Sequence, residues 1–310
     1  MRGSGPAHVG VAGVRLLARV EVAEGVAQLD ASGSGTHGPE AAAPGPGQQA
    51  GGGAIGGAGA PAAMDKATFI PSLFDRIARH YDLMNIVMTA GVWRLWQRAF
   101  RRRCGIGPGQ AVLDVGCGTA ELSLLLAGLV GPSGRVTGID VSPGMLEVGR
   151  AKVFASRHAG RIQLLLGDAT DLGFADDSFD AAASAFVLRN VAHLDQALAE
   201  IARVVRPGGR VALLELSHPP ASWIRRPFLF YFRRILPLLG TWAARAGLPV
   251  APYAWLPQSL QTFPGAEALA ARLEAAGLCE VSFLRLTAGI VCLHTARVGP
   301  GRKSGDASGA

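Results

Sequence analysis

Ala111-Val-Leu-Asp-Val-Gly-Cys-Gly-Thr-Ala-Glu-Leu122 is the stretch that decides the fold of this chain of 310 residues. Its apolar run ends at Gly116-Cys117-Gly118, and Thr119 then opens a segment whose leucines recur at helical spacing. The stretch predicts a buried strand, a glycine turn and the start of a helix. The glycines allow a sharp turn and the close approach of a ligand, and the helix start offers that ligand free N–H groups.

The residues around Gly116 and Gly118 indicate which ligand the turn would bind. A dinucleotide pyrophosphate usually requires a third glycine three positions after the second, and Glu121 stands there. Asp114 stands two residues before Gly116, where a carboxylate repels a pyrophosphate but attracts an ammonium group. The pattern therefore favours S-adenosylmethionine (SAM) over NAD. An ordinary strand–helix turn without a ligand is the alternative.

Strands and helices alternate along the chain after this stretch. We expect further parallel strands over residues 135–140, 161–166, 181–186 and 210–216, a tight turn at 206–209, and a final antiparallel pair over 279–286 and 289–296. This alternation predicts an α/β fold whose mostly parallel sheet carries helices on both faces. Ligands of such sheets bind at the carboxyl ends of the strands. The residues expected at those ends are Asp114, Gly116, Asp140, Asp168, Ser184, Arg189 and Glu215.

Two of these acids suit an adenosyl group. Asp140 ends the second expected strand, 24 positions after Gly116, where a carboxylate reaches the ribose hydroxyls of a bound nucleoside. Asp168 ends the third expected strand and can accept a hydrogen bond from the adenine amino group, while the small Ala169 leaves room for the ring.

The parts of the chain outside this pattern differ in composition. Residues 1–63 hold 16 of the 42 glycines and predict a disordered extension, unless Met64 is the true start. Residues 64–105 predict a lid of two helices, broken at Tyr81–Asn85. Residues 219–250 form a basic aromatic insertion, interpreted equally well as a membrane-contact surface or as a capping helix. Residues 301–310 predict a loose tail.

Charge and cysteine usage limit the classes of protein. The net charge of +7 suits an anionic partner such as membrane lipid or nucleic acid. The basic residues form no separate nucleic-acid-binding module, so we expect no nucleic-acid partner. Four cysteines lie far apart without metal-ligand spacing, which favours reduced thiols in the cytosol and no metal site. No apolar run is long enough for a transmembrane helix.

Two long segments resemble signatures of one family. Tyr81-Asp82-x-Met84-Asn85, with Thr89 and Trp96, and the segment Arg203-Val-Val-Arg-Pro-Gly-Gly-Arg-Val-Ala-Leu-Leu-Glu-x-Ser217 are similar to those of the ubiquinone/menaquinone biosynthesis C-methyltransferases, which are class I SAM-dependent methyltransferases. The segments 186–191, 253–257 and 287–294 are similar to further family stretches. The chain departs from the family's usual residues at Thr89, Trp93, Val187 and Arg206.

The resemblance implies a fold, a methyl donor and a reaction. It implies a seven-stranded Rossmann-like sheet with an antiparallel final strand within a methyltransferase domain over residues 64–300. The SAM contacts that it implies, together with those expected from the residues themselves, are Asp114, Gly116, Gly118, Thr119, Asp140, Asp168, Ala169 and Ser184. The reaction would methylate a ring carbon of a prenylated quinol, giving menaquinol from demethylmenaquinol or the methylated benzoquinol precursor of ubiquinone.

The acceptor side of the expected cleft offers three candidate catalytic residues. Arg189, just beyond a strand end, would stabilise the phenolate that forms when a quinol hydroxyl loses its proton. Asn190 would hold the substrate oxygen or a water, and Tyr81 would relay the proton. A structural ion pair between Arg189 and an acid such as Asp114 is the alternative.

The expected partners follow from the hydrophobic, prenylated substrate. Its isoprenoid tail partitions into membrane, so we expect a cytoplasmic protein that contacts the inner face of the membrane peripherally, and the sequence leaves a homodimer open. An NAD-linked oxidoreductase, an RNA methyltransferase and a methyltransferase acting on another lipophilic acceptor are the competing interpretations.

Overall fold

The computed structural model describes residues 66–89, 91–235, 238, 241 and 251–300. The expected extension over 1–63, the tail over 301–310 and part of the insertion over 219–250 lie outside the described residues.

A seven-stranded sheet organises the described residues, as expected. Its strands are β1 (Ala111–Val115), β2 (Arg135–Asp140), β3 (Ile162–Leu166), β4 (Phe179–Ala185), β5 (Val205–Leu216), β6 (Leu278–Leu286) and β7 (Val291–Val298). They lie in the order β3-β2-β1-β4-β5-β7-β6. The first five strands pair in parallel, and β7 runs antiparallel to both of its neighbours. The α/β fold class with an antiparallel final strand is therefore confirmed.

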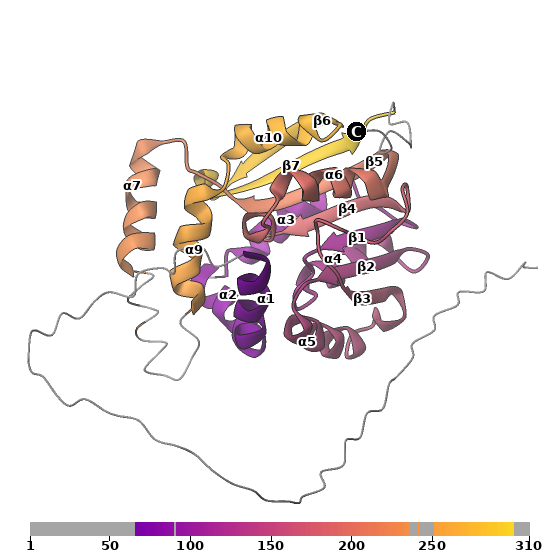
Figure 1. The fold of residues 1–310 in the computed structure, drawn as a ribbon, viewed down its shortest axis with the longest axis horizontal. Helices are drawn as coiled ribbons and strands as arrows, with labels where there is room; N and C mark the ends of the chain where they lie inside the picture. Colours follow the sequence, from indigo (N-terminus) through magenta and orange to yellow (C-terminus); the bar gives the residue numbers. More distant parts are fainter. Residues whose placement is uncertain (1–65, 90, 236–237, 239–240, 242–250, 301–310) are drawn as a thin grey trace, which may run out of the picture. The chain divides into compact units, whose positions relative to one another are not determined.

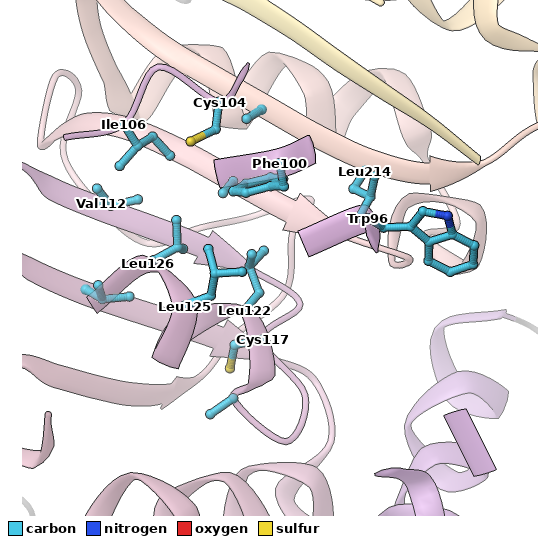
Figure 2. Packing of buried hydrophobic residues seen from close by; sticks show 14 of the residues in the cluster. Trp96, Phe100, Cys104, Ile106, Val112, Cys117, Leu122, Leu125, Leu126 and Leu214 are labelled. Atoms are coloured by element: carbon cyan, nitrogen blue, oxygen red, sulfur yellow. The ribbon is translucent and has the colours of Figure 1, made fainter. Parts of the chain in front are cut away.

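Helices cover both faces of the sheet (Figure 1). On one face, α3 (Trp93–Arg103), α4 (Glu121–Val130) and α5 (Pro143–Phe154) contribute to one buried cluster. On the other face, α6 (Leu194–Val204) and α10 (Ala266–Ala275) contribute to a second cluster. Figure 2 shows Phe100 of α3 near the leucines of α4, whereas Trp96 lies at the edge of this group. The α3 helix thus joins the core at one end and leaves the other free for a site.

The chain before the sheet forms three helices rather than two. These are α1 (Lys66–Ile77), α2 (Tyr81–Thr89) and α3, and the 3-10 turn η1 (Ala78–His80) separates α1 from α2. The expected break at Tyr81–Asn85 is therefore wrong. Tyr81 begins α2, and Asp82 lies in its first turn, where the helix dipole favours a negative charge. Met84 is buried, so this polar-looking stretch still packs as a helix.

The expected turn at residues 206–209 lies inside a strand. β5 begins at Val205, and the left-handed φ of +77° at Gly208 falls within it. The pairing of β4 with β5 shifts between Phe179 and Ala181 and thereby accommodates the extra residues. The glycine pair bends a continuous strand instead of separating a helix from it.

The basic aromatic insertion is helical where the structure describes it. It contains α7 (Ser222–Phe230) and one π-helical turn, η4 (Tyr231–Ile235). The helix α9 (Ala251–Thr262) follows the insertion. The helices α1, α2 and α9 gather at the end of the sheet where its parallel strands finish (Figure 1).

Candidate active site

A cavity of about 840 Å³ runs along the carboxyl ends of the strands. This volume lies in the upper part of the range for small-molecule sites, about 300–1,000 Å³. The segments after β1, β2 and β3 line it largely with small and acidic residues. The segments after β4 and β5 and before β7 line it largely with aromatic and aliphatic residues, among which stand the polar Arg189 and Asn190. The cavity therefore has an acidic half and an apolar half, in the order of the strands.

The glycine loop forms the floor of the acidic half. Gly116 and Gly118 line the cavity with φ of +70° and +51°, which glycine adopts without strain. A Cβ atom on Gly116 would stand 2.3 Å from Val187, so this glycine allows the β4 segment to approach. The helix α4 begins at Glu121, two residues after the expected Thr119, and the residue before it, Ala120, makes no side-chain cap.

The two expected nucleoside acids both line the cavity. Asp140 accepts hydrogen bonds from the backbone N–H of Gly118 at 2.8 Å and of Ser142 at 2.9 Å, one on each oxygen. Burial raises the pKa of the Asp140 carboxyl, and these two hydrogen bonds oppose the rise. Each oxygen keeps a second lone pair for a ligand hydroxyl. Asp168 is exposed and uses one oxygen to bond Thr170.

Ala169 and Thr119 also line the cavity, as expected. Ala169 is buried after β3. The Thr119 hydroxyl donates a hydrogen bond of 2.7 Å to Asp82 Oδ1, and Asp82 also forms an ion pair with Lys152 of α5. A residue of the helical lid is thus bonded directly to the glycine loop.

Asp114 and Ser184 lie behind the cavity rather than on its wall. Neither lines it, and Asp114 is fully buried. Asp114 Oδ2 accepts a hydrogen bond of 2.5 Å from Ser123, and Ser184 donates one of 2.8 Å to the carbonyl of Val115. Burial raises the pKa of Asp114 to about 7, despite the opposing hydrogen bond from Ser123. These two residues support the glycine loop from within the sheet.

Arg189 lines the cavity and forms a buried ion pair. It lies in the 3-10 turn η3 (Leu188–Asn190), and its Nη1 donates to Glu215 Oε1 and to the Phe186 carbonyl, both at 2.7 Å. Side-chain exposure is 10% for Arg189 and 2% for Glu215. Arg189 thus has a carboxylate partner, but this is Glu215 at the end of β5 and not Asp114. The Arg189 side chain therefore both lines the cavity and forms a structural ion pair.

Asn190 and Tyr81 reach the same cavity from different elements. Asn190 Oδ1 accepts a hydrogen bond of 2.9 Å from the indole N–H of Trp255 in α9. Burial raises the pKa of the Tyr81 phenol, and a hydrogen bond with Asn85 and the charge of Arg189 oppose the rise. Tyr81 is therefore a neutral phenol at physiological pH.

Sequence reasoning missed the aromatic wall of the apolar half. Phe186 has a φ of +61°, which is costly for a residue with a side chain, and its ring packs 5.8 Å from Trp93 and 5.6 Å from Trp96. The Trp96 indole donates a hydrogen bond of 2.7 Å to Thr287. These residues are far apart in the sequence. Only knowledge that the segments around 93–96, 186 and 287 contact one another could have indicated the wall.

The described residues contain no helix long and apolar enough to cross a membrane. No group of three or more His, Cys, Asp or Glu side chains in the described part of the chain is arranged to hold a metal ion.

The sheet order, the glycine loop and the acids after successive strands define a class I SAM-dependent methyltransferase. Residues 63–298 match the ubiE/COQ5 methyltransferase family, and the chain belongs to that family.

Comparisons with individual proteins agree with this family. The demethylmenaquinone methyltransferase of Symbiobacterium thermophilum is 42% identical over 247 residues, covering 79% of this chain and 97% of that protein. The ubiquinone/menaquinone biosynthesis C-methyltransferase UbiE of Hahella chejuensis is 39% identical over 231 residues, covering 74% and 92%. A chain of the solved Haloferax volcanii complex containing the Trm112 methyltransferase activator shares the fold, with 18% identity, a TM-score of 0.51 and coverage of 73% and 97%.

Proposed function

We propose that this protein methylates a ring carbon of a prenylated quinol and converts demethylmenaquinol into menaquinol. The observation that carries the proposal is that one cavity combines an acidic half, which suits an adenosyl sulfonium, with an apolar half, which suits a hydrophobic ring. The names of the relatives at 42% and 39% identity support the same substrate class.

The acidic half fits the methyl donor by the chemistry of its residues. Asp140 and Asp168 offer carboxylate oxygens toward hydroxyl and amino groups, and the absence of a Cβ at Gly116 and Gly118 lets a ligand approach the backbone. When bound, SAM supplies an electrophilic methyl group. The carboxylates also favour its positive charge electrostatically.

The acceptor chemistry assigned to this chain centres on one oxygen. A quinol ring carbon becomes strongly nucleophilic when the neighbouring hydroxyl loses its proton. The ring carbon then gains the methyl group as the methyl–sulfur bond breaks and leaves a neutral thioether, and it loses its hydrogen as a proton, which restores the aromatic ring. Arg189 stabilises the developing phenolate, and the neutral Tyr81 donates a hydrogen bond or relays the proton. Alignment of ring and methyl in one cavity provides the remaining acceleration.

A methylation assay tests the proposed function. Purified full-length protein, SAM and reduced demethylmenaquinone with a short prenyl tail should give a product heavier by one CH₂ unit, detected by mass spectrometry. A demethylated benzoquinol with the same tail is the parallel substrate, because one relative carries ubiquinone in its name. Methylation of neither quinol under conditions where SAM binds in calorimetry would contradict the proposal.

We further propose that the protein meets its substrate at the inner face of the cytoplasmic membrane. The helix α7 supports this by having two kinds of surface. Phe228 is buried and lines the cavity, whereas Trp223 and Phe230 are 75% and 60% exposed. Arg225 and Arg226 are exposed beside them. Exposed aromatic and basic side chains on one helix suit an anionic lipid surface.

Sedimentation with liposomes tests the membrane contact. Replacing Arg225, Arg226 and Arg234 by glutamine should lower binding to anionic liposomes by about tenfold, at roughly 1 kcal/mol for each charge near the surface and allowing for incomplete contact. The matched control replaces Arg101, Arg102 and Arg103, exposed residues at the end of α3 opposite Trp93, by glutamine. Equal binding by both triple variants would show that net charge alone is responsible.

A further inference from the structure

We propose that Trp255 is a positioning residue, which holds the Asn190 amide so that its NH₂ group donates a hydrogen bond to the acceptor oxygen. This inference rests on the proposed function, because it assigns the orientation of one group at the acceptor site.

The chemistry of the indole fixes the orientation of the Asn190 amide. An indole nitrogen carries a hydrogen and can only donate, so the Asn190 atom 2.9 Å from Trp255 Nε1 has to be the carbonyl oxygen. The amide NH₂ therefore lies on the other branch of the side chain. Within the part of the chain that the structure describes, Nδ2 makes no hydrogen bond. Asn190 lines the cavity and is 7% exposed, so the cavity is where this donor can find a partner.

Trp255 is itself held in place. It belongs to α9, and its ring packs edge-on against Phe69 of α1 with 5.3 Å between the ring centroids. Asn190 lies 65 residues earlier in the chain, in η3. The hydrogen bond thus links the acceptor site to two helices that line the cavity, and a rotation of the amide would leave the indole N–H without its acceptor.

The neighbouring charge makes the donor useful for an anion. Arg189, adjacent in sequence, also lines the cavity; among the described residues its guanidinium bonds the carboxylate of Glu215, whose Oε1 also accepts from the backbone N–H of Leu216. A guanidinium and an amide NH₂ together stabilise an oxygen that carries negative charge. The site is therefore arranged to bind the acceptor as its phenolate.

Replacing Trp255 by phenylalanine separates the hydrogen bond from the packing. Phenylalanine keeps an aromatic ring against Phe69 but removes the N–H, so the Asn190 amide can rotate. We expect W255F to lower kcat/KM for the quinol by about tenfold and to leave SAM affinity unchanged, since one hydrogen bond to a charged group is weakened. The increase of kcat/KM with pH should move to higher pH, because the phenolate is less stabilised.

Ionisation of a bound phenol gives a readout independent of methyl transfer. 1-Naphthol serves as the probe, with its ionisation followed by absorbance in lipid-free solution. We expect its pKa to fall on binding to the wild type, and the fall to be smaller in W255F by about one unit. Asn190→Leu, which removes the NH₂ donor without adding a charge, should abolish the fall, and it tests the donor itself should W255F fold poorly.

Phe154→Leu is the control, because Phe154 is 86% exposed, does not line the cavity and belongs to no proposed binding surface. It should give the wild-type naphthol pKa. A wild-type naphthol pKa in folded W255F, or in Asn190→Leu, would overturn the inference. The methylation assay decides the proposed function separately, since it asks whether a quinol is methylated and not how the oxygen is held.

Discussion

The ion pair between Arg189 and Glu215 is unusual because both groups are almost out of reach of water. Arg189 Nε and Glu215 Oε2 are buried without a hydrogen-bond partner in the described residues. Burial of two charges is costly, and their attraction offsets this cost only while both are present. The pair therefore has two effects: it orients the guanidinium at the cavity, and it makes the fold depend on each partner.

Glu215→Ala should destabilise the protein by about 3–5 kcal/mol, because it leaves the Arg189 charge buried and unpaired. Urea unfolding followed by circular dichroism measures this loss. Asp195→Ala is the control, since it breaks the exposed pair with Arg272 and should change stability by less than about 1 kcal/mol. Similar losses in both variants would mean that the buried pair is no stronger than a surface pair.

At the scale of the element, the glycine loop depends on close contact with the segment after β4. Gly116 has a left-handed φ, and its missing Cβ leaves room for the side chain of Val187. The loop and the β4 segment are therefore fitted to one another in this chain.

Gly116→Ala should weaken both the fold and SAM binding. The left-handed backbone costs roughly 1–2 kcal/mol with a side chain, and the new Cβ would collide with Val187 at 2.3 Å. Adding Val187→Gly should recover part of the lost stability, although Val187→Gly alone should destabilise the wild type. Urea unfolding of the four proteins in this cycle measures the coupling. Additive losses would mean that the two residues do not compete for space.

A second element, the helix α2, is anchored to the glycine loop by Asp82. We expect Asp82→Ala to speed amide hydrogen exchange across α2 and to weaken SAM binding by roughly tenfold, because it removes a hydrogen bond to a charged group. Thr119→Val should have the same effect, and the double variant should be no worse than either single one. A larger loss in Thr119→Val than in Asp82→Ala would instead indicate that the Thr119 hydroxyl contacts SAM directly.

At the scale of the whole molecule, the sequence predicted the sheet better than the cavity. Alternation of strands and helices was sufficient for the parallel strands and for the acids at the ends of β2 and β3, whereas the order of the strands in the sheet came only from the structure. It could not show that Asp114 faces Ser123 inside the sheet, because this depends on the register of α4. Sequence reasoning also did not pair Arg189 with Glu215, 26 residues away, or Asn190 with Trp255, 65 residues away, because contacts between such distant residues depend on the tertiary fold.

The stability of the whole fold should depend on pH through Asp114. Its pKa rises from 3.8 to about 7 on folding, so between these values the folded state holds a proton that the unfolded state has lost. Its contribution to stability therefore falls as pH rises from about 4 to about 7 and stays low above that. The Asp114→Asn side chain cannot ionise. The free energy of unfolding of this variant should therefore rise relative to that of the wild type over this window, by about 1.4 kcal/mol per pH unit at most. Urea midpoints at pH 5, 6, 7 and 8 measure the gain. An advantage that does not vary with pH would assign the change to packing.

The division of the cavity between two groups of strands has a consequence for descent. The segments after β1, β2 and β3 build the half that suits the adenosyl group, whereas the opposite half comes from the chain beyond Ala185 and from the leading helices. Inherited change can therefore rebuild one half while the other is kept. A lineage can acquire a new acceptor by changes in the leading helices and in the chain beyond Ala185, while the segments after β1, β2 and β3 continue to bind the same methyl donor.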